Sequence, residues 1–222
     1  MKSSRPLLLL LLRHEETESP RGVLYGQRDV PLSGRGRQRT EKLVERLSRL
    51  PVEAVYSSDL SRALYGAELL SRRTGAPLFV NPLLREIDFG EWTGLSLSEL
   101  LEIPEFAQRL ATPEKISPPG GESLSQLFAR ASRMLDLIRR KHPGGLVVTF
   151  AHGGFNRALV SSVLGLSPRR FFTLEQHPGA LNLLVFFPEG VPLLALFNAP
   201  AEIDLAAWVE YYEGGAGPPR SN

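Results

Sequence analysis

Residues 7–14 read Leu7-Leu8-Leu9-Leu10-Leu11-Leu12-Arg13-His14, a run of six leucines that leads directly into two polar side chains. The run is far shorter than the roughly 20 apolar residues that a membrane-spanning helix needs. A short run that is apolar at every position is typical of a central strand covered by helices on both faces. We therefore expect a buried strand here, with Arg13 and His14 directly beyond its carboxyl end.

The composition and the residues around this run limit the class of protein. Lys2 and Arg5 precede the run as in a signal peptide, but charged residues follow it where a cleavage site would need small ones. The chain has 222 residues, no cysteine and a formal charge of +2. Disulfide scaffolds, thiolate zinc sites and Cys nucleophiles are therefore excluded. We expect a cytoplasmic protein with no membrane segment and, since no basic run occurs, no nucleic-acid partner.

Strand-like apolar runs alternate with helix-like segments along the rest of the chain. Further strands are predicted at residues 54–57, 77–80, 146–151, 181–187 and 192–197, and helices run from the cap Ser33 to Leu50, from Asp59 or Ser61 to Thr74, from the capping box Ser123 and Gln126 to His142, and from Phe155 to Leu164. This alternation predicts one α/β domain, a three-layer α/β/α sandwich around a mostly parallel sheet with right-handed crossovers.

Residues 86–121 interrupt this alternation, because prolines and paired glycines surround a single short helical stretch at about residues 98–110. Such segments are typical of insertions that cover a site and select its substrate. We predict one domain over residues 1–212, with a lid at about residues 95–121 and a flexible tail at residues 213–222.

Polar side chains follow four of the predicted strands, and in an open α/β sheet ligands bind beyond the carboxyl ends of the strands. These residues are Arg13 and His14 after the first strand, Ser58, Asp59 and Arg62 after the second, Arg85 and Glu86 after the third, and His152, Gly153 and Gly154 after the fourth. An Arg fork fits two phosphate oxygens, and Arg62 would lie in a first helical turn, where free N–H groups favour an anion. We therefore expect a phosphoryl ligand.

These residue types also predict a reaction. A neutral imidazole such as that of His14 can attack phosphorus and form a phosphohistidine, and this chemistry needs neither a metal nor a cofactor. Arg13, Arg62 and a second histidine would stabilise the charge of the transferred group. Glu86 would protonate the leaving alkoxide and then accept a proton from water.

Several ordered blocks resemble the histidine phosphatase superfamily, also called phosphoglycerate mutase-like, over nearly the whole chain. The blocks are Leu12-Arg13-His14-Glu15-Glu16-Thr17-Glu18, Tyr25-Gly26-Gln27-Arg28-Asp29-Val30-Pro31-Leu32-Ser33, Ser57-Ser58-Asp59-Leu60-Ser61-Arg62-Ala63, Leu84-Arg85-Glu86-Ile87-Asp88-Phe89-Gly90-Glu91-Trp92-Thr93-Gly94, Gly120-Gly121-Glu122-Ser123 and Ala151-His152-Gly153-Gly154. The resemblance implies a phosphoglycerate mutase-like fold, with His14 as the phosphorylated nucleophile and Glu86 as the proton donor. It also implies that Arg13, Arg62 and His152 bind phosphate.

The same resemblance places Tyr25, Gly26 and Gly153 near the substrate. Two residues depart from the family pattern, because Glu15 stands where the family has Gly after the nucleophile and Pro20 stands where an Asn is common. A carboxylate beside a phosphate would repel it. We therefore expect either low turnover or a Glu15 side chain that faces elsewhere.

Other polar residues have ordinary structural interpretations. We interpret His142 as a cation that favours the end of its helix, His177 as a loop residue, and the cluster Arg35, Arg37 and Arg39 as a solvated helix face. Glu86 has charged neighbours with which it could form an ordinary ion pair instead of a catalytic contact.

The leading hypothesis is a metal-independent phosphomonoesterase that acts on a small phosphorylated metabolite. Phosphatase is favoured over phosphoglycerate mutase, because the lid carries only Arg109 and Lys115 as cations, and the block around Glu86 resembles the branch with α-ribazole phosphatases. The alternative is a non-catalytic descendant that binds a phosphorylated ligand. A nucleotide-binding domain lacks its glycine motif here, and a metal-dependent hydrolase lacks closely spaced ligands. The apolar runs near the C-terminus fit a homodimer edge or simply two paired strands.

Overall fold

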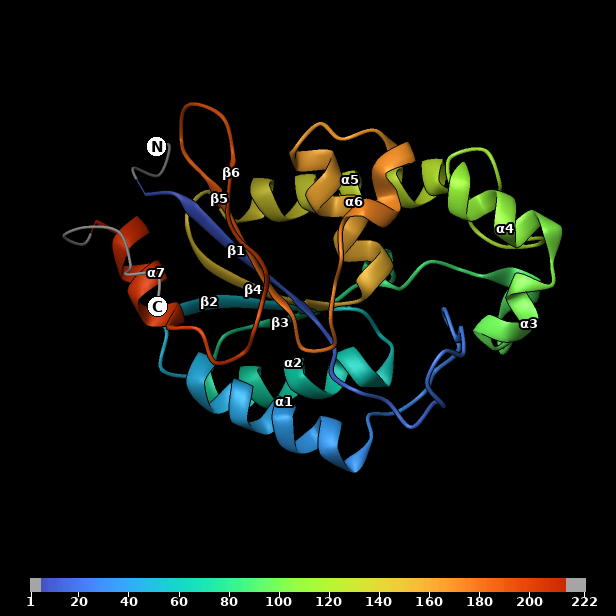
Figure 1. Ribbon diagram of the computed structural model, residues 1–222. Coiled ribbons are helices and arrows are strands. Elements are labelled where there is room, and N and C mark those ends of the chain that lie inside the picture. The colour runs from blue at the N-terminus through green and yellow to red at the C-terminus, as the bar shows by residue number, and fades with distance from the viewer. Residues whose placement is uncertain (1–4, 215–222) are drawn as a thin grey trace.

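The computed structural model describes residues 5–214 and is built around one six-stranded sheet with the strand order β3-β2-β4-β1-β5-β6 (Figure 1). The strands are β1 (Leu7–Arg13), β2 (Val52–Ser57), β3 (Leu78–Val80), β4 (Gly145–Ala151), β5 (Leu181–Phe186) and β6 (Leu193–Ala199). β1, β2, β3 and β4 pair in parallel, whereas β5 pairs antiparallel with both β1 and β6. The predicted mostly parallel sheet is confirmed, and so is the pairing of the last two strands.

Helices cover both faces of this sheet, as the three layers in Figure 1 show. The helices are α1 (Gly34–Leu47), α2 (Ser61–Thr74), α3 (Leu97–Leu101), α4 (Pro104–Ala111), α5 (Leu124–Lys141), α6 (Gly153–Val163) and α7 (Leu205–Tyr212), with short 3-10 turns at Pro82–Leu84, Gly90–Trp92 and Pro168–Thr173. Side chains of α1, α2 and α7 pack on one face, and those of α5 and α6 pack on the other. The predicted three-layer α/β/α sandwich is therefore confirmed.

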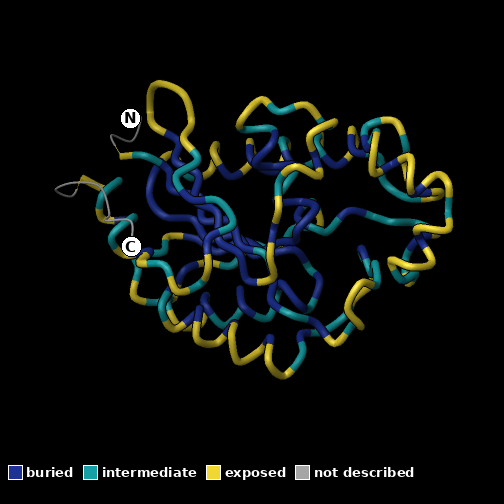
Figure 2. The backbone as a smooth tube through the Cα atoms, in the orientation of Figure 1, coloured by how far each residue is buried: buried dark blue, intermediate teal, exposed yellow. Residues whose placement is uncertain are grey.

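The six leucines of β1 belong to two different cores, because successive side chains of a strand point to opposite faces. Leu7, Leu9 and Leu11 join the core under α5 and α6, whereas the leucines between them join the core under α1 and α2. Each of the six is at most 2% exposed, and Figure 2 shows the buried centre of the sheet in dark blue. This two-sided burial fixes the strand, so its polar carboxyl end is held in a defined place.

The start of α2 differs from the prediction. Its N-cap residue is Leu60, which has no side chain that can cap the helix. Asp59 binds Arg85 instead, and the backbone N–H of Ser61 donates to Asp29 at 2.8 Å. The acceptor for this helix end thus comes from a loop 32 residues earlier in the chain, where no local capping pattern would indicate it.

The single helical stretch predicted inside the lid is in fact two helices, because Pro104 cannot continue α3 and instead begins α4. These helices share a small core with Trp92, Leu100 and Phe106. In Figure 1 they lie beyond the ends of the central strands, apart from the main layers. This placement positions α4 beside the strand ends that carry the predicted site.

His142 lies at the C-cap of α5, but its predicted role as a cation is wrong. Burial lowers the pKa of its imidazole, with Lys141 acting in the same direction. Its Nε2 lies 2.9 Å from the hydroxyl of Tyr56. His142 is therefore structural, as expected, but as a neutral hydrogen-bonding partner.

Two further expectations concern a tail at residues 213–222 and the absence of a membrane segment. The predicted tail lies outside the described residues, apart from Glu213 and Gly214. Within residues 5–214, no helix is long and apolar enough to cross a membrane.

Candidate active site

The register of the central strands brings His14 and His152 together. Arg13 of β1 pairs with Ala151 of β4, so the residue after each strand end is a histidine. The backbone N–H of His14 donates to the carbonyl of Ala151 at 3.1 Å, and the two imidazole centroids lie 5.2 Å apart in an edge-on arrangement. The prediction that these strand ends meet is thus confirmed by the geometry.

The hydrogen bond of His14 defines which of its nitrogens is free. Its Nδ1 lies 2.7 Å from the backbone carbonyl of Glu15, and a carbonyl can only accept, so Nδ1 carries the proton. Burial, together with the charges of Arg62 and Arg13, lowers the pKa of His14 well below its ordinary value. The imidazole is therefore neutral near pH 7, with an unprotonated Nε2 that can act as a nucleophile.

His152 is fixed by Ser58, a residue at the end of β2. Its Nε2 lies 2.7 Å from the Ser58 hydroxyl, while its Nδ1 is buried without a hydrogen-bond partner within the described chain. Burial lowers the pKa of His152 well below its ordinary value, and the neighbouring His14 lowers it further. In the tautomer in which Ser58 donates to Nε2, Nδ1 is an N–H donor that needs an acceptor.

Arg62 lies beside the histidines, and two carbonyls of a nearby loop take up part of its guanidinium. One terminal nitrogen donates to the carbonyl of Arg28 at 2.9 Å, and the other donates to that of Gly26 at 2.6 Å. Its Nε is buried and has no partner within the described chain. Arg62 therefore holds the loop of residues 26–28 with two of its five N–H donors, and it keeps Nε–H and a second N–H on each terminal nitrogen for a ligand.

Arg13 also combines a hydrogen bond to a backbone carbonyl with a buried Nε that has no partner among residues 5–214. One terminal nitrogen donates to the backbone carbonyl of Gln176, and its Nε is buried without a partner in the described part of the chain. Unpaired buried donors are costly in a folded protein. Three such donors, on two cationic arginines (Arg13 and Arg62) and the neutral His152, lie in the cluster around His14, and a phosphoryl group would give them acceptors.

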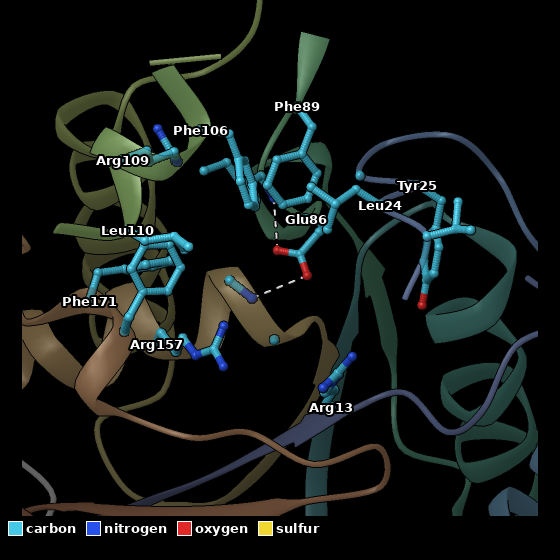
Figure 3. Close-up of a pocket in the computed structure, with 16 residues that line it drawn as sticks. Arg13, Leu24, Tyr25, Glu86, Phe89, Phe106, Arg109, Leu110, Arg157 and Phe171 are labelled. Carbon is cyan, nitrogen blue, oxygen red and sulfur yellow. Dashed lines mark hydrogen bonds between the residues drawn. The ribbon is translucent and has the colours of Figure 1, made fainter. Parts of the chain in front are cut away.

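Glu86 lines the same cavity as Arg13, and its carboxyl orientation is fixed by two backbone N–H groups. Ile87 donates to one oxygen at 2.8 Å, and Gly154, in the first turn of α6, donates to the other at 3.1 Å (Figure 3). Its backbone carbonyl accepts from Arg130 at 3.0 Å. Glu86 makes no ion pair within residues 5–214, because its neighbour Arg85 binds Asp59 instead.

Arg130 is a positioning residue that the sequence did not indicate. Its guanidinium donates to the carbonyls of Leu83 and Arg85 as well as to that of Glu86. Its charge is balanced by Glu122, whose two carboxylate oxygens each lie 2.7 Å from it. This half-buried pair holds the segment before Glu86 against α5, and only the Glu122 half of it lies in a sequence block that resembles the family.

The predicted substrate contacts Tyr25, Gly26 and Gly153 all line one cavity, together with Arg13 and Glu86. Figure 3 shows the Tyr25 ring on one wall and the Glu86 carboxyl at the top of the open space. The ring centroids of Tyr25 and His14 lie 6.4 Å apart. The cavity therefore lies next to the histidine cluster, with Arg13 and Gly153 on its wall, and reaches α4 of the lid through Phe106 and Leu110.

Residues 9–199 match the family model of the histidine phosphatase superfamily, branch 1. The chain belongs to the histidine phosphatase superfamily. Phosphoserine phosphatase 1 of Hydrogenobacter thermophilus is 32% identical to it over 168 residues, which cover 74% of this chain and 80% of that protein. The predicted family is thus confirmed.

Two solved structures extend this comparison. The native structure of a mycobacterial glucosyl-3-phosphoglycerate phosphatase is similar at a TM-score of 0.79 and 28% identity, covering 88% of this chain and all of that one (100%). The α-ribazole phosphatase of Shigella flexneri is similar at a TM-score of 0.77 and 21% identity, over 86% of this chain and 96% of that one, and shares the fold. The family and its named phosphatases make this histidine phosphatase superfamily member a phosphoric monoester hydrolase.

The departure from the superfamily pattern at Glu15 is explained by the direction of its side chain. The carboxylate lies 3.7 Å from Arg39 of α1 and against Gly179, in a second cavity that neither Arg13 nor Glu86 lines. Burial raises the pKa of Glu15, and Arg39 partly offsets this. Glu15 therefore faces away from the phosphate-binding donors, and Arg39 is more than the solvated residue that we expected.

Pro20, the second departure, is exposed and does not line the cavity that contains Glu86. His177 is an exposed loop residue, as expected; its Nδ1 lies 3.8 Å from Glu175.

Arg157 of α6 also lines the cavity that contains Glu86, and it is not among the predicted site residues. It lies four residues after Gly153, which is the spacing of one helical face, so the motif at His152 gave a usable signal.

Proposed function

We propose that this protein is a metal-independent phosphomonoesterase that works through a phosphohistidine on His14. The observation that carries the proposal is the hydrogen bond from Nδ1 of His14 to the carbonyl of Glu15. It leaves Nε2 of a buried, neutral imidazole unprotonated among donors from Arg13, Arg62 and His152. A nucleophile and its electrostatic stabilisers therefore lie around one point.

The first half-reaction transfers the phosphoryl group to the enzyme. The lone pair on Nε2 of His14 forms a bond to phosphorus while the bond from phosphorus to the ester oxygen breaks. That oxygen takes a proton from Glu86 and leaves as an alcohol. Arg13, Arg62 and His152 donate to the other phosphoryl oxygens, whose charge increases in the transition state.

The second half-reaction restores the enzyme. Glu86, now a carboxylate, accepts a proton from a water molecule whose oxygen bonds to phosphorus as the bond to Nε2 of His14 breaks. Inorganic phosphate leaves, and both residues return to their starting states. The N–H groups of Ile87 and Gly154 hold the carboxyl in one place for both transfers.

We propose a small phosphorylated metabolite as the substrate in the cell, and a cytoplasmic site of action. The names of the relatives support this class, because phosphoserine and glucosyl-3-phosphoglycerate are both small phosphomonoesters. α-Ribazole 5'-phosphate is a further candidate, suggested by the sequence block around Glu86.

Hydrolysis of an aryl phosphate in the presence of a chelator tests the proposal. We expect the wild type to turn over p-nitrophenyl phosphate with EDTA present, and His14→Ala to lose at least about a thousandfold. Glu86→Gln should lose about a hundredfold or more on alkyl phosphates but much less on p-nitrophenyl phosphate, whose leaving group needs no proton. Turnover that requires a metal, or that survives His14→Ala, would refute the proposal.

A further inference from the structure

The cavity that adjoins Glu86 is large enough for an organic leaving group. It has a volume of about 220 Å³, and a cavity of about 150 Å³ is known to hold a benzene ring in another protein. Apolar and aromatic side chains form most of its wall, namely those of Leu24, Phe89, Phe106, Leu110, Phe171 and Phe172. The part of the substrate beyond the ester oxygen therefore meets a mainly apolar surface.

Arg157 brings a positive charge to this apolar wall. It lies three residues after Gly154 on α6, so both residues occupy one face of the helix, about 4.5 Å apart along its axis. The N–H of Gly154 holds the Glu86 carboxyl. In Figure 3 the guanidinium of Arg157 extends from α6 into the same open space as that carboxyl. An anionic group of the substrate that binds Arg157 would thus be separated by only a few bonds from the ester oxygen that Glu86 protonates.

The guanidinium of Arg157 has donors left for a ligand. Its Nε donates to the carbonyl of Leu174 at 2.6 Å, and its Cζ lies 5.8 Å from the centre of the Phe171 ring. Across residues 5–214, no carboxylate lies within ion-pairing distance of it, and its terminal nitrogens make no hydrogen bond. Burial lowers the pKa of Arg157, and the negative charges of Glu86 and Glu175 act in the opposite direction without forming an ion pair with it. A carboxylate on a ligand would give this guanidinium a direct charged partner.

The second arginine on the wall, Arg109 of α4, is less available. It is only 2% exposed, and one of its terminal nitrogens donates to the carbonyl of Ile116 within the lid. Burial lowers its pKa to about 10. Arg109 therefore stabilises the lid with one terminal nitrogen, while its other terminal nitrogen is buried without a partner in the described chain. Arg157 is the arginine that shares a helix turn with Gly154, the residue that holds the Glu86 carboxyl.

We propose that Arg157 selects the substrate, and that the natural substrates are phosphate esters of hydroxy acids that carry an apolar or aromatic group. The carboxylate of such a substrate binds Arg157, its apolar group fills the cavity between Phe106 and Phe171, and its phosphate lies at His14. This inference rests on the proposed function and adds to it the chemical class of the leaving group.

Two pairs of matched substrates test the inference. The first pair is 3-carboxyphenyl phosphate and its neutral amide, 3-carbamoylphenyl phosphate, which differ in charge but hardly in size. We expect the wild type to prefer the acid at least tenfold in kcat/KM, and Arg157→Met to lose this preference. The second pair is phospholactate and phospho-3-phenyllactate, and we expect the phenyl compound to be preferred at least tenfold.

Control variants separate the role of Arg157 from changes elsewhere. Arg169→Met removes an exposed arginine outside this cavity and should keep the preference for the acid. Arg157→Lys keeps a cation and should retain part of it. Because each preference is a ratio for one enzyme, an effect of Arg157 on Glu86 or on folding cancels. If Arg157→Met is too inactive to measure, the Lys variant decides the test.

The outcomes distinguish the two proposals. Equal rates for the acid and the amide in the wild type, with p-nitrophenyl phosphate still hydrolysed, would overturn the role of Arg157 and leave the proposed function standing. An unchanged preference in Arg157→Met would do the same. Failure of the wild type to hydrolyse any of these esters would instead overturn the proposed function, and this inference with it.

Discussion

The carboxyl group of Glu86 accepts a hydrogen bond of 3.1 Å from the backbone N–H of Gly154, a residue 68 positions later in the chain. This contact joins the segment after β3 to the first turn of α6, directly after His152. A helix N-terminus offers unpaired N–H groups, and here one of them orients an acid–base group. The second histidine motif thus provides both the ring that we propose to bind phosphate and a support for the proposed proton donor.

Gly154→Ala should disturb this contact while preserving the fold. A Cβ atom at residue 154 would lie 2.3 Å from a carboxylate oxygen of Glu86, which would have to move. We expect kcat on alkyl phosphates to fall by about one to two orders of magnitude, since general acid–base catalysis supplies about 10²–10⁴. The matched control is Gly34→Ala, whose Cβ meets open space. A Gly154→Ala variant with full activity would show that the contact does not position Glu86.

Ser58→Ala tests whether the hydroxyl of Ser58 orients His152. The variant removes the 2.7 Å partner of Nε2, so Nδ1 is no longer fixed as a donor toward the phosphoryl group. We expect binding of vanadate to weaken about tenfold, which corresponds to one hydrogen bond. Ser58→Thr, which keeps a hydroxyl, should restore much of the affinity. A loss of thermal stability without a change in vanadate affinity would indicate a structural role only.

The two histidines predict an unusual pH dependence. Their pKa values lie well below 6.5, so both rings stay neutral as the pH falls from 8 to 6, where an ordinary imidazole takes up its proton. NMR titration of the free enzyme should therefore show neutral-imidazole shifts for His14 and His152 down to pH 6. A midpoint near pH 6.5 for either ring would contradict the burial argument.

Much of this site follows from the sequence because its physical causes are local or follow from the sheet. The all-leucine run of β1 predicted a two-sided strand, and parallel strand ends must meet at one edge, so His14 and His152 were expected together. Glu86 was placed correctly by the same rule. These predictions needed only strand order and polarity, which alternating strands and helices largely determine.

The parts that could not be predicted depend on distant partners. The guanidinium of Arg62 is partly taken up by loop carbonyls, and Asp29 caps α2 in place of Asp59 or Ser61. The direction of Glu15 depends on Arg39 and on the absence of a side chain at Gly179. None of these contacts has a local sequence signal, because each joins segments that only the folded sheet brings together.

Glu15→Gln tests the direction of that side chain. Burial raises the pKa of Glu15 above its ordinary 4.5, so the folded state binds this proton more tightly than the unfolded state does. The stabilisation of the wild type by the bound proton is complete below about pH 4.5 and is lost as the pH rises through the pKa of the folded state. Urea unfolding should therefore show the variant gaining stability relative to the wild type between pH 4 and pH 7. Turnover should stay within about twofold, since the carboxylate faces away from the donors; an opposite pH trend or a large change in turnover would contradict this.

The central claim is that His14 carries the phosphoryl group during turnover. Its most direct test is to mix the enzyme with a ³²P-labelled phosphomonoester, quench within milliseconds, and map the labelled residue by mass spectrometry. The account predicts label on His14, stable in base and labile in acid as a nitrogen-linked phosphate is, and none in His14→Ala. Turnover of the wild type with no labelled protein at any quench time, or with label on another residue, would contradict it.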